Sequence, residues 1–204
     1  LISGRGSNME ALLQADLPGR CVAVISNRPD AGGLAFAAER GVPAVVVNHR
    51  DFASREAFDA ALAQQIDALG AHWVFLAGFM RILSEGFVRH FEERLINIHP
   101  SLLPSFPGLD THGQAIKAGV RVHGATVHFV TPELDAGPAI AQAAVPVLDD
   151  DSAETLARRV LVQEHVIYPA AARWLLEGRV RLAGGRVCVD VPQAGDAALV
   201  SPRP

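Results

Sequence analysis

The feature that most constrains the fold is the alternation, over residues 1–99, of short apolar runs with segments of helical periodicity. The runs are continuously apolar rather than alternating, which is typical of strands covered on both faces in a parallel sheet. The expected strands are residues 1–3, 21–27, 43–48, 72–79 and 95–99. The expected crossover helices cover about residues 7–15, 32–41, 54–69 and 84–91. We therefore predict an open, mostly parallel, Rossmann-like α/β sheet with helices on both faces.

The pattern changes in the C-terminal part of the chain. Only a short turn separates the apolar runs 124–131 and 139–147, which favours an antiparallel pair over a crossover connection. A long amphipathic segment follows at about 152–177, and residues 179–191 have the pattern of a terminal hairpin around two glycines. Because no linker divides the chain, residues 1–191 are expected to form a single domain. The polar residues 192–204 are expected to form a flexible tail.

Composition excludes several classes of protein. Half of the 204 residues are hydrophobic and the net charge is −4, so nothing favours binding to nucleic acid or to an acidic membrane surface. No apolar run approaches the roughly 18 residues that a membrane span needs. Cys21 and Cys188 lie far apart with no metal-ligand spacing, which favours a reduced, cytoplasmic setting. No metal site is expected, and Cys21, inside an apolar run, is expected to be core.

The stretch "SGRGSN" (3–8) lies between an expected strand and helix. Glycines at such a place let backbone N–H groups approach an anion at the helix N-terminus. It is not a dinucleotide fingerprint, because Met9 takes the position of the third glycine and no acidic residue ends the next strand. A single phosphate is the better ligand. The alternative is a plain turn in which Ser7 caps the helix.

The stretch "LINIHPSLLP" (95–104) places an amide and an imidazole at the tip of an apolar strand. Asn97 and His99, two residues apart, project to the same side of a strand. They could act as an oxyanion donor and a proton-transfer group at the edge where α/β sheets bind ligands. Asp135, in the turn "ELDAGP", is the natural carboxylate partner if that turn folds back over the edge. The alternative is a purely structural His99.

Six motifs occur in an order that resembles the phosphoribosylglycinamide formyltransferase family. These are "ISGRGSN", "SREAFD", "LAGFMRIL", "NIHPSLLPSFPG", "HGATVHFVTPELDAGP" and "QEH..YP", and together they extend over the chain to about Leu182. The resemblance implies the formyltransferase fold and transfer of the formyl group of 10-formyltetrahydrofolate, a folate co-substrate, to the amine of glycinamide ribonucleotide in purine biosynthesis. It implies small-molecule substrates, no metal, a monomer or homodimer, and a cis Leu103–Pro104 bond.

The resemblance also assigns residues to roles. Asn97, His99 and Asp135 match the catalytic residues. Gly6, Ser7 and Asn8 match the loop that holds the ribonucleotide, and Glu164 matches a further contact to it. The folate side is matched by Arg55, Met80, Arg81, Ile82, Leu83, Asn97, Thr131, Pro132, Glu133, Leu134 and Asp135. One departure is Leu161, which stands where a polar or basic residue is expected near the phosphate.

Three other functions compete with this reading. Formyltetrahydrofolate deformylase would use the same three catalytic residues with water as acceptor, but usually carries an extra N-terminal regulatory domain. Methionyl-tRNA formyltransferase needs a C-terminal tRNA-binding domain, for which the short polar tail leaves no room. A non-catalytic nucleotide- or folate-binding module would not need all three candidate catalytic residues. Folate release that depends on the ribonucleotide would separate the transferase from the deformylase.

Overall fold

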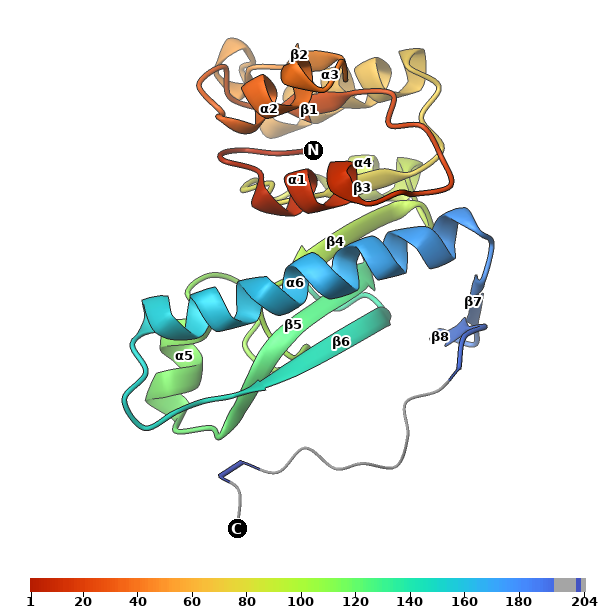
Figure 1. Ribbon diagram of the computed structural model, residues 1–204. Helices are drawn as coiled ribbons and strands as arrows, with labels where there is room; N and C mark the ends of the chain where they lie inside the picture. The colour runs from red at the N-terminus through yellow and green to blue at the C-terminus, as the bar shows by residue number, and fades with distance from the viewer. Residues whose placement is uncertain (193–200, 203–204) are drawn as a thin grey trace. The chain divides into compact units, whose positions relative to one another are not determined.

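The computed structural model describes residues 1–192 and 201–202 (Figure 1). The chain divides into two compact units. The first consists of Leu1–Asn97 and Phe129–Glu133, and the second of Ile98–His128 and the chain from Leu134 onward. Most of the tail predicted for residues 192–204 lies outside the described residues, and its flexibility stays a prediction.

Parallel strands form the centre of the first unit. β1 (Val24–Ser26) pairs in parallel with β2 (Ala44–Val46), and β3 (Val74–Leu76) pairs in parallel with β4 (Leu95–His99). The predicted strand at residues 1–3 runs between β1 and β3. Ile2 makes a parallel bridge to Ser26, and the Ala77 N–H donates to the carbonyl of Leu1 over 2.9 Å. These pairings confirm the parallel α/β arrangement.

Helices connect these strands, as the sequence predicts. They are α1 (Ser7–Gln14), α2 (Gly33–Glu39), α3 (Arg55–Ala68) and α4 (Glu85–His90), with a 3₁₀ turn, η1 (His49–Asp51), after β2. The Ser54 hydroxyl caps α3 by accepting the Ala57 N–H over 3.1 Å. Phe58 and Leu62 of α3 pack in a core with strand residues such as Leu95.

The second unit combines a long antiparallel pair with helices. β5 (Val122–Phe129) and β6 (Ala139–Pro146) are antiparallel, as predicted, and α6 (Ala153–Leu176) lies along them (Figure 1). The other elements are α5 (Thr111–Ala118) and the predicted hairpin of β7 (Val180–Ala183) and β8 (Arg186–Val189). Leu156 and Val160 of α6 are fully buried in this unit's core.

The sequence interpretation of the run 21–27 is wrong in part. The run forms a strand only at Val24–Ser26, because its parallel partner β2 pairs with those residues alone. Cys21 therefore precedes the strand and is exposed rather than core; its thiol donates to the Ala23 carbonyl over 3.5 Å. The alternative in which Ser7 caps α1 is wrong, because Gly6 holds the N-cap position.

Candidate functional site

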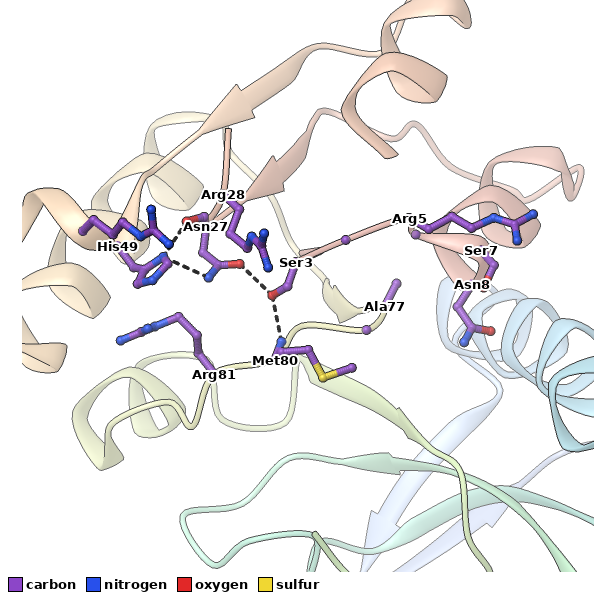
Figure 2. A pocket seen from close by; sticks show the side chains of 14 residues that line it. Ser3, Arg5, Ser7, Asn8, Asn27, Arg28, His49, Ala77, Met80 and Arg81 are labelled. Carbon is purple, nitrogen blue, oxygen red and sulfur yellow. Dashed lines mark hydrogen bonds between the residues drawn. The ribbon is translucent and has the colours of Figure 1, made fainter. Parts of the chain in front are cut away.

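A cavity of about 510 Å³ opens at the carboxyl ends of the parallel strands in the first unit (Figure 2). Its lining comes from four segments, each of which follows a strand: residues 3–8, 27–28, 49–50, and 77–78 with 80–81. Loops that follow neighbouring parallel strands meet at one edge, so ligands of open α/β sheets bind there. The cavity is therefore where the fold predicts a ligand.

The glycine loop forms one end of this cavity. Gly6 has φ 78°, in the left-handed region that favours glycine, and its carbonyl accepts the Glu10 N–H as α1 begins. Gly33 lets the loop pack closely, since a Cβ there would lie 2.9 Å from the Arg5 carbonyl oxygen. Ser7 and Asn8 follow in the first turn of α1 and line the cavity. The predicted residues Gly6, Ser7 and Asn8 thus lie together at a helix N-terminus, which suits an anion.

A hydrogen-bonded group that the sequence interpretation missed lies beside this loop (Figure 2). The Ser3 hydroxyl donates to Asn27 Oδ1 over 2.6 Å and accepts the Met80 N–H over 2.8 Å. Nδ1 of His49 lies 2.8 Å from the Asn27 carbonyl oxygen and 3.2 Å from Asn27 Nδ2. Ser3 and Asn27 are 5% and 4% exposed. The sequence held a sign of this group, because the polar residues Ser3 and Asn27 end the otherwise apolar runs 1–3 and 21–27.

The residues predicted for the folate side are not all brought together. Met80 and Arg81 line the cavity, and the Arg81 guanidinium lies 5.1 Å from the centre of the Phe58 ring. Ile82 is exposed, and Leu83 packs partly against the core. Arg55 is not among the lining residues; it pairs with Glu56 over 3.3 Å on the surface of α3.

The remaining folate-side candidates form the turn after β5. The Thr131 hydroxyl donates to the Glu133 carbonyl over 3.2 Å, Pro132 lies between them, and Leu134 is exposed. Asp135 follows with φ 52°, a left-handed conformation that is uncommon outside glycine. This conformation lets the chain reverse within the turn.

In the second unit His99 and Asp135 face each other. His99 Nδ1 lies 3.6 Å from Asp135 Oδ2, and the two side chains are 8% and 9% exposed. His99 Nε2 lies 3.2 Å from the Phe106 carbonyl oxygen, and Asp135 Oδ2 accepts the Gly108 N–H over 2.9 Å. Both ring nitrogens of His99 therefore face oxygen atoms, one from the Asp135 carboxylate and one from the Phe106 backbone.

Asn97 and His99 are two residues apart on β4, as predicted, and Asn97 is the less buried of the two. Beyond the strand, the hydroxyl of Thr126 holds the loop that contains Pro100 and Pro104. Thr126 Oγ1 donates to the Ser101 carbonyl over 2.7 Å and accepts the Leu103 N–H over 3.0 Å. The predicted Leu103–Pro104 bond is cis.

Two further histidines of the second unit lie near this loop. His123 is 1% exposed, and its ring packs edge-on against Phe106 and His112. Burial, with a smaller contribution from His112, lowers the pKa of His123 to about 4. The pKa of His112 is also lowered, chiefly by burial. Both rings are therefore neutral at neutral pH.

Glu164, predicted for the ribonucleotide, is buried on α6, 7% exposed. Leu161 lies one turn earlier on the same helix and is half-buried.

Among the described residues, no group of three or more His, Cys, Asp or Glu side chains is arranged to hold a metal ion. Every helix in the part of the chain that the structure describes is too short or too polar to cross a membrane.

Fold and geometry define an α/β protein with a glycine loop at a helix N-terminus and a buried histidine–carboxylate pair. Residues 1–172 match the family described as Formyl transferase, and the chain belongs to that family. It is 47% identical over 205 residues to the phosphoribosylglycinamide formyltransferase of Escherichia coli K12, covering 97% of each chain. It is also 45% identical to the human trifunctional purine biosynthetic protein adenosine-3. That match covers 92% of this chain and 19% of the human protein.

Solved structures agree with this assignment. Glycinamide ribonucleotide transformylase 1 from Symbiobacterium toebii has a TM-score of 0.89 and 49% identity, over 92% of this chain and 91% of that one. A formyltetrahydrofolate deformylase from Pseudomonas syringae pv. tomato str. DC3000 has a TM-score of 0.85 and 32% identity, over 92% of this chain and 64% of that one. The chain therefore has the formyltransferase fold, and the deformylase is the more distant of these two.

Proposed function

We propose that this protein transfers the formyl group of 10-formyltetrahydrofolate to the amine of phosphoribosylglycinamide in de novo purine biosynthesis. The products are the N-formyl ribonucleotide and tetrahydrofolate. The observation that carries the proposal is the glycine loop in its cavity, because an enzyme that hydrolysed formyl-folate would need no site for a phosphate. Similarity over nearly the full length of the E. coli formyltransferase supports the same acceptor.

The ribonucleotide phosphate would bind at the start of α1. Backbone N–H groups after Gly6 are not used inside the helix in its first turn, and the helix dipole adds a partial positive charge there. Ser7 and Asn8 offer side-chain contacts at the same place. Glu164 would contact the ribose hydroxyls, which donate to a carboxylate. With Leu161 apolar, phosphate binding would rest on the loop rather than on α6.

His99, Asn97 and Asp135 would carry the reaction. Attack of the substrate amine on the formyl carbon forms a C–N bond and leaves negative charge on the formyl oxygen. Asn97 and His99 would donate hydrogen bonds to that oxygen, and Asp135 would orient the His99 ring. The C–N10 bond then breaks, and the proton lost by the amine is taken up by N10 of tetrahydrofolate. His99 is the residue placed to help that proton transfer.

The folate co-substrate would contact Met80, Arg81, Ile82 and Leu83 together with the turn Thr131–Asp135. Met80 and Ile82 are 73% and 63% exposed, and large exposed apolar side chains next to a cavity suit a flat aromatic ligand. Arg55, exposed on α3, would reach only an outlying carboxylate of the folate. No step of the reaction as written requires a metal ion.

An assay of tetrahydrofolate release with and without phosphoribosylglycinamide tests the proposal. Formyl transfer predicts release only when the ribonucleotide is present, with formyl ribonucleotide formed in equal amount. Release at the same rate without ribonucleotide would instead establish a deformylase. Deformylase activity is the second candidate because the P. syringae deformylase is 32% identical to this chain.

Three further expectations belong to this proposal. Residues 1–191 would act as one formyltransferase domain, with the hairpin at 179–191 as its C-terminal part. The enzyme would work in the cytoplasm, where its small-molecule substrates are found. It would function as a monomer or a homodimer, without nucleic acid or membrane partners. Light scattering of the purified protein would decide its oligomeric state.

A further inference from the structure

The hydroxyl of Ser3 lies at the floor of the cavity, between two segments with different proposed roles (Figure 2). Gly4, the next residue, begins the glycine loop proposed for the ribonucleotide. Met80, whose N–H donates to the hydroxyl over 2.8 Å, begins the segment proposed for the folate. The buried Ser3 side chain thus contacts the backbone of the folate segment at Met80, and Ser3 itself directly precedes the ribonucleotide loop.

Ser3 fixes the start of the segment that begins at Met80. The side chains of Met80 and Ile82 are 73% and 63% exposed, so burial of these two side chains contributes little to its order, and its packing contacts come from Arg81 and Leu83. Ser3 also holds the chain just before the segment, because its own N–H donates to the Gly78 carbonyl over 3.2 Å. Segments with few buried apolar contacts depend on such backbone hydrogen bonds for their local stability.

Asn27 determines which way the Ser3 hydroxyl points. A hydroxyl has one proton, and Ser3 gives it to Asn27 Oδ1 over 2.6 Å, so its lone pairs remain for the Met80 N–H. The His49 ring lies beside Asn27, with Nδ1 2.8 Å from the backbone carbonyl oxygen of Asn27. A proton on Nδ1 would be donated to that carbonyl, so this contact holds the backbone of Asn27.

We propose that Ser3 is a positioning residue for the folate-side segment at Met80, with Asn27 orienting its hydroxyl. This inference rests on the proposed function for its folate readout, but the contact itself can be measured without any activity. Ser3 would touch neither the formyl carbon nor the amine. Its loss should therefore raise KM for formyl-folate more than it lowers kcat.

The test compares Ser3→Thr with Ser3→Val, which have nearly the same shape and differ in the hydroxyl. Any effect of the extra bulk is shared by both variants. The Val variant leaves the Met80 N–H and Asn27 Oδ1 without partners, and should raise KM for formyl-folate about tenfold relative to Thr, as expected for one lost hydrogen bond. Ser3→Ala should resemble Val, without the extra bulk. Amide hydrogen exchange at Met80 should be faster in Val and Ala than in Thr.

Ser152→Ala is the control for a general loss of stability. It also removes a hydroxyl that accepts a backbone N–H, at the cap of α6, outside the proposed site. It should lower the melting temperature without changing Met80 exchange or KM. Equal Met80 exchange in the Thr and Val variants, or equal KM for formyl-folate, would overturn the inference. Lack of ribonucleotide-dependent turnover in the unaltered protein would count against the proposed function instead, because the exchange measurement does not depend on it.

Discussion

His99 and Asp135 face each other over 3.6 Å, and each side chain is more than nine-tenths buried. The far nitrogen of His99 faces the Phe106 carbonyl, and the same Asp135 oxygen accepts the Gly108 N–H. The 106–108 loop therefore holds both members of the pair through its backbone. Phe106 and Asp135 have φ of 55° and 52°, and such left-handed conformations outside glycine cluster at functional sites.

Replacing His99 or Asn97 by alanine should each lower kcat at least about a hundredfold. General acid–base help is worth roughly 10²–10⁴ in rate, and one oxyanion donor roughly 10²–10³. Steady-state assays of folded protein check this. His90→Ala is the matched control, since His90 is exposed on α4 and pairs with Asp67. Near-normal turnover in a folded His99→Ala variant would end the proposed mechanism.

Asp135→Asn should lower kcat. The amide keeps the shape of the side chain but removes the negative charge that lies 3.6 Å from His99 Nδ1, so the His99 ring would lose the group that orients it. Steady-state assays of both folded proteins test this. Equal kcat in the two proteins would show that the carboxylate is not needed to orient His99.

Gly6→Val should raise KM for the ribonucleotide about tenfold or more and leave KM for formyl-folate nearly unchanged. Valine is strained at φ 78°, and its Cβ would lie 3.1 Å from Met9 Cε. The strained valine would displace the backbone N–H groups at the start of α1 that are proposed to hold the phosphate. Gly86→Val on α4 is the control, because a Cβ there meets no atom within 4 Å. A larger effect on formyl-folate would mean that the loop serves the other substrate.

Acidification should destabilise the protein through His123. Its pKa is about 4 in the folded state against 6.5 ordinarily, so between these values the unfolded chain binds a proton that the folded chain does not. The free energy of unfolding therefore falls as pH drops from 6.5 to 4, by at most about 1.4 kcal/mol per pH unit from this residue. Urea denaturation at several pH values measures it.

The variant His123→Leu should flatten that dependence while leaving other titrating groups in place. Both ring nitrogens of His123 lack a hydrogen-bond partner in the described structure, so leucine would give up only the edge-on ring contacts with Phe106 and His112. If the two proteins lose stability in parallel below pH 6.5, another group is responsible.

The sequence by itself determined the order and type of the main elements. Continuous apolar runs with helices between them specify parallel strands because both faces of such strands are covered. Polar residues and glycines that follow such strands, as Gly6, Asn97 and His99 do, could then be predicted as site residues before any contact was known. The spacing of two residues along β4 was enough to predict that Asn97 and His99 project to the same side of the strand.

Only the tertiary structure decided the contacts that depend on segments distant in the sequence. Asp135 meets His99 because a turn in a left-handed conformation folds back, and the 106–108 loop that holds both has no sequence pattern announcing it. Ser3, Asn27 and Met80 come together because three strands end side by side. Cys21 lies outside the core because its strand is paired only from Val24 onward. Local patterns encode which face of an element is apolar, but pairing and hydrogen-bond geometry are set by neighbours that the local pattern does not contain.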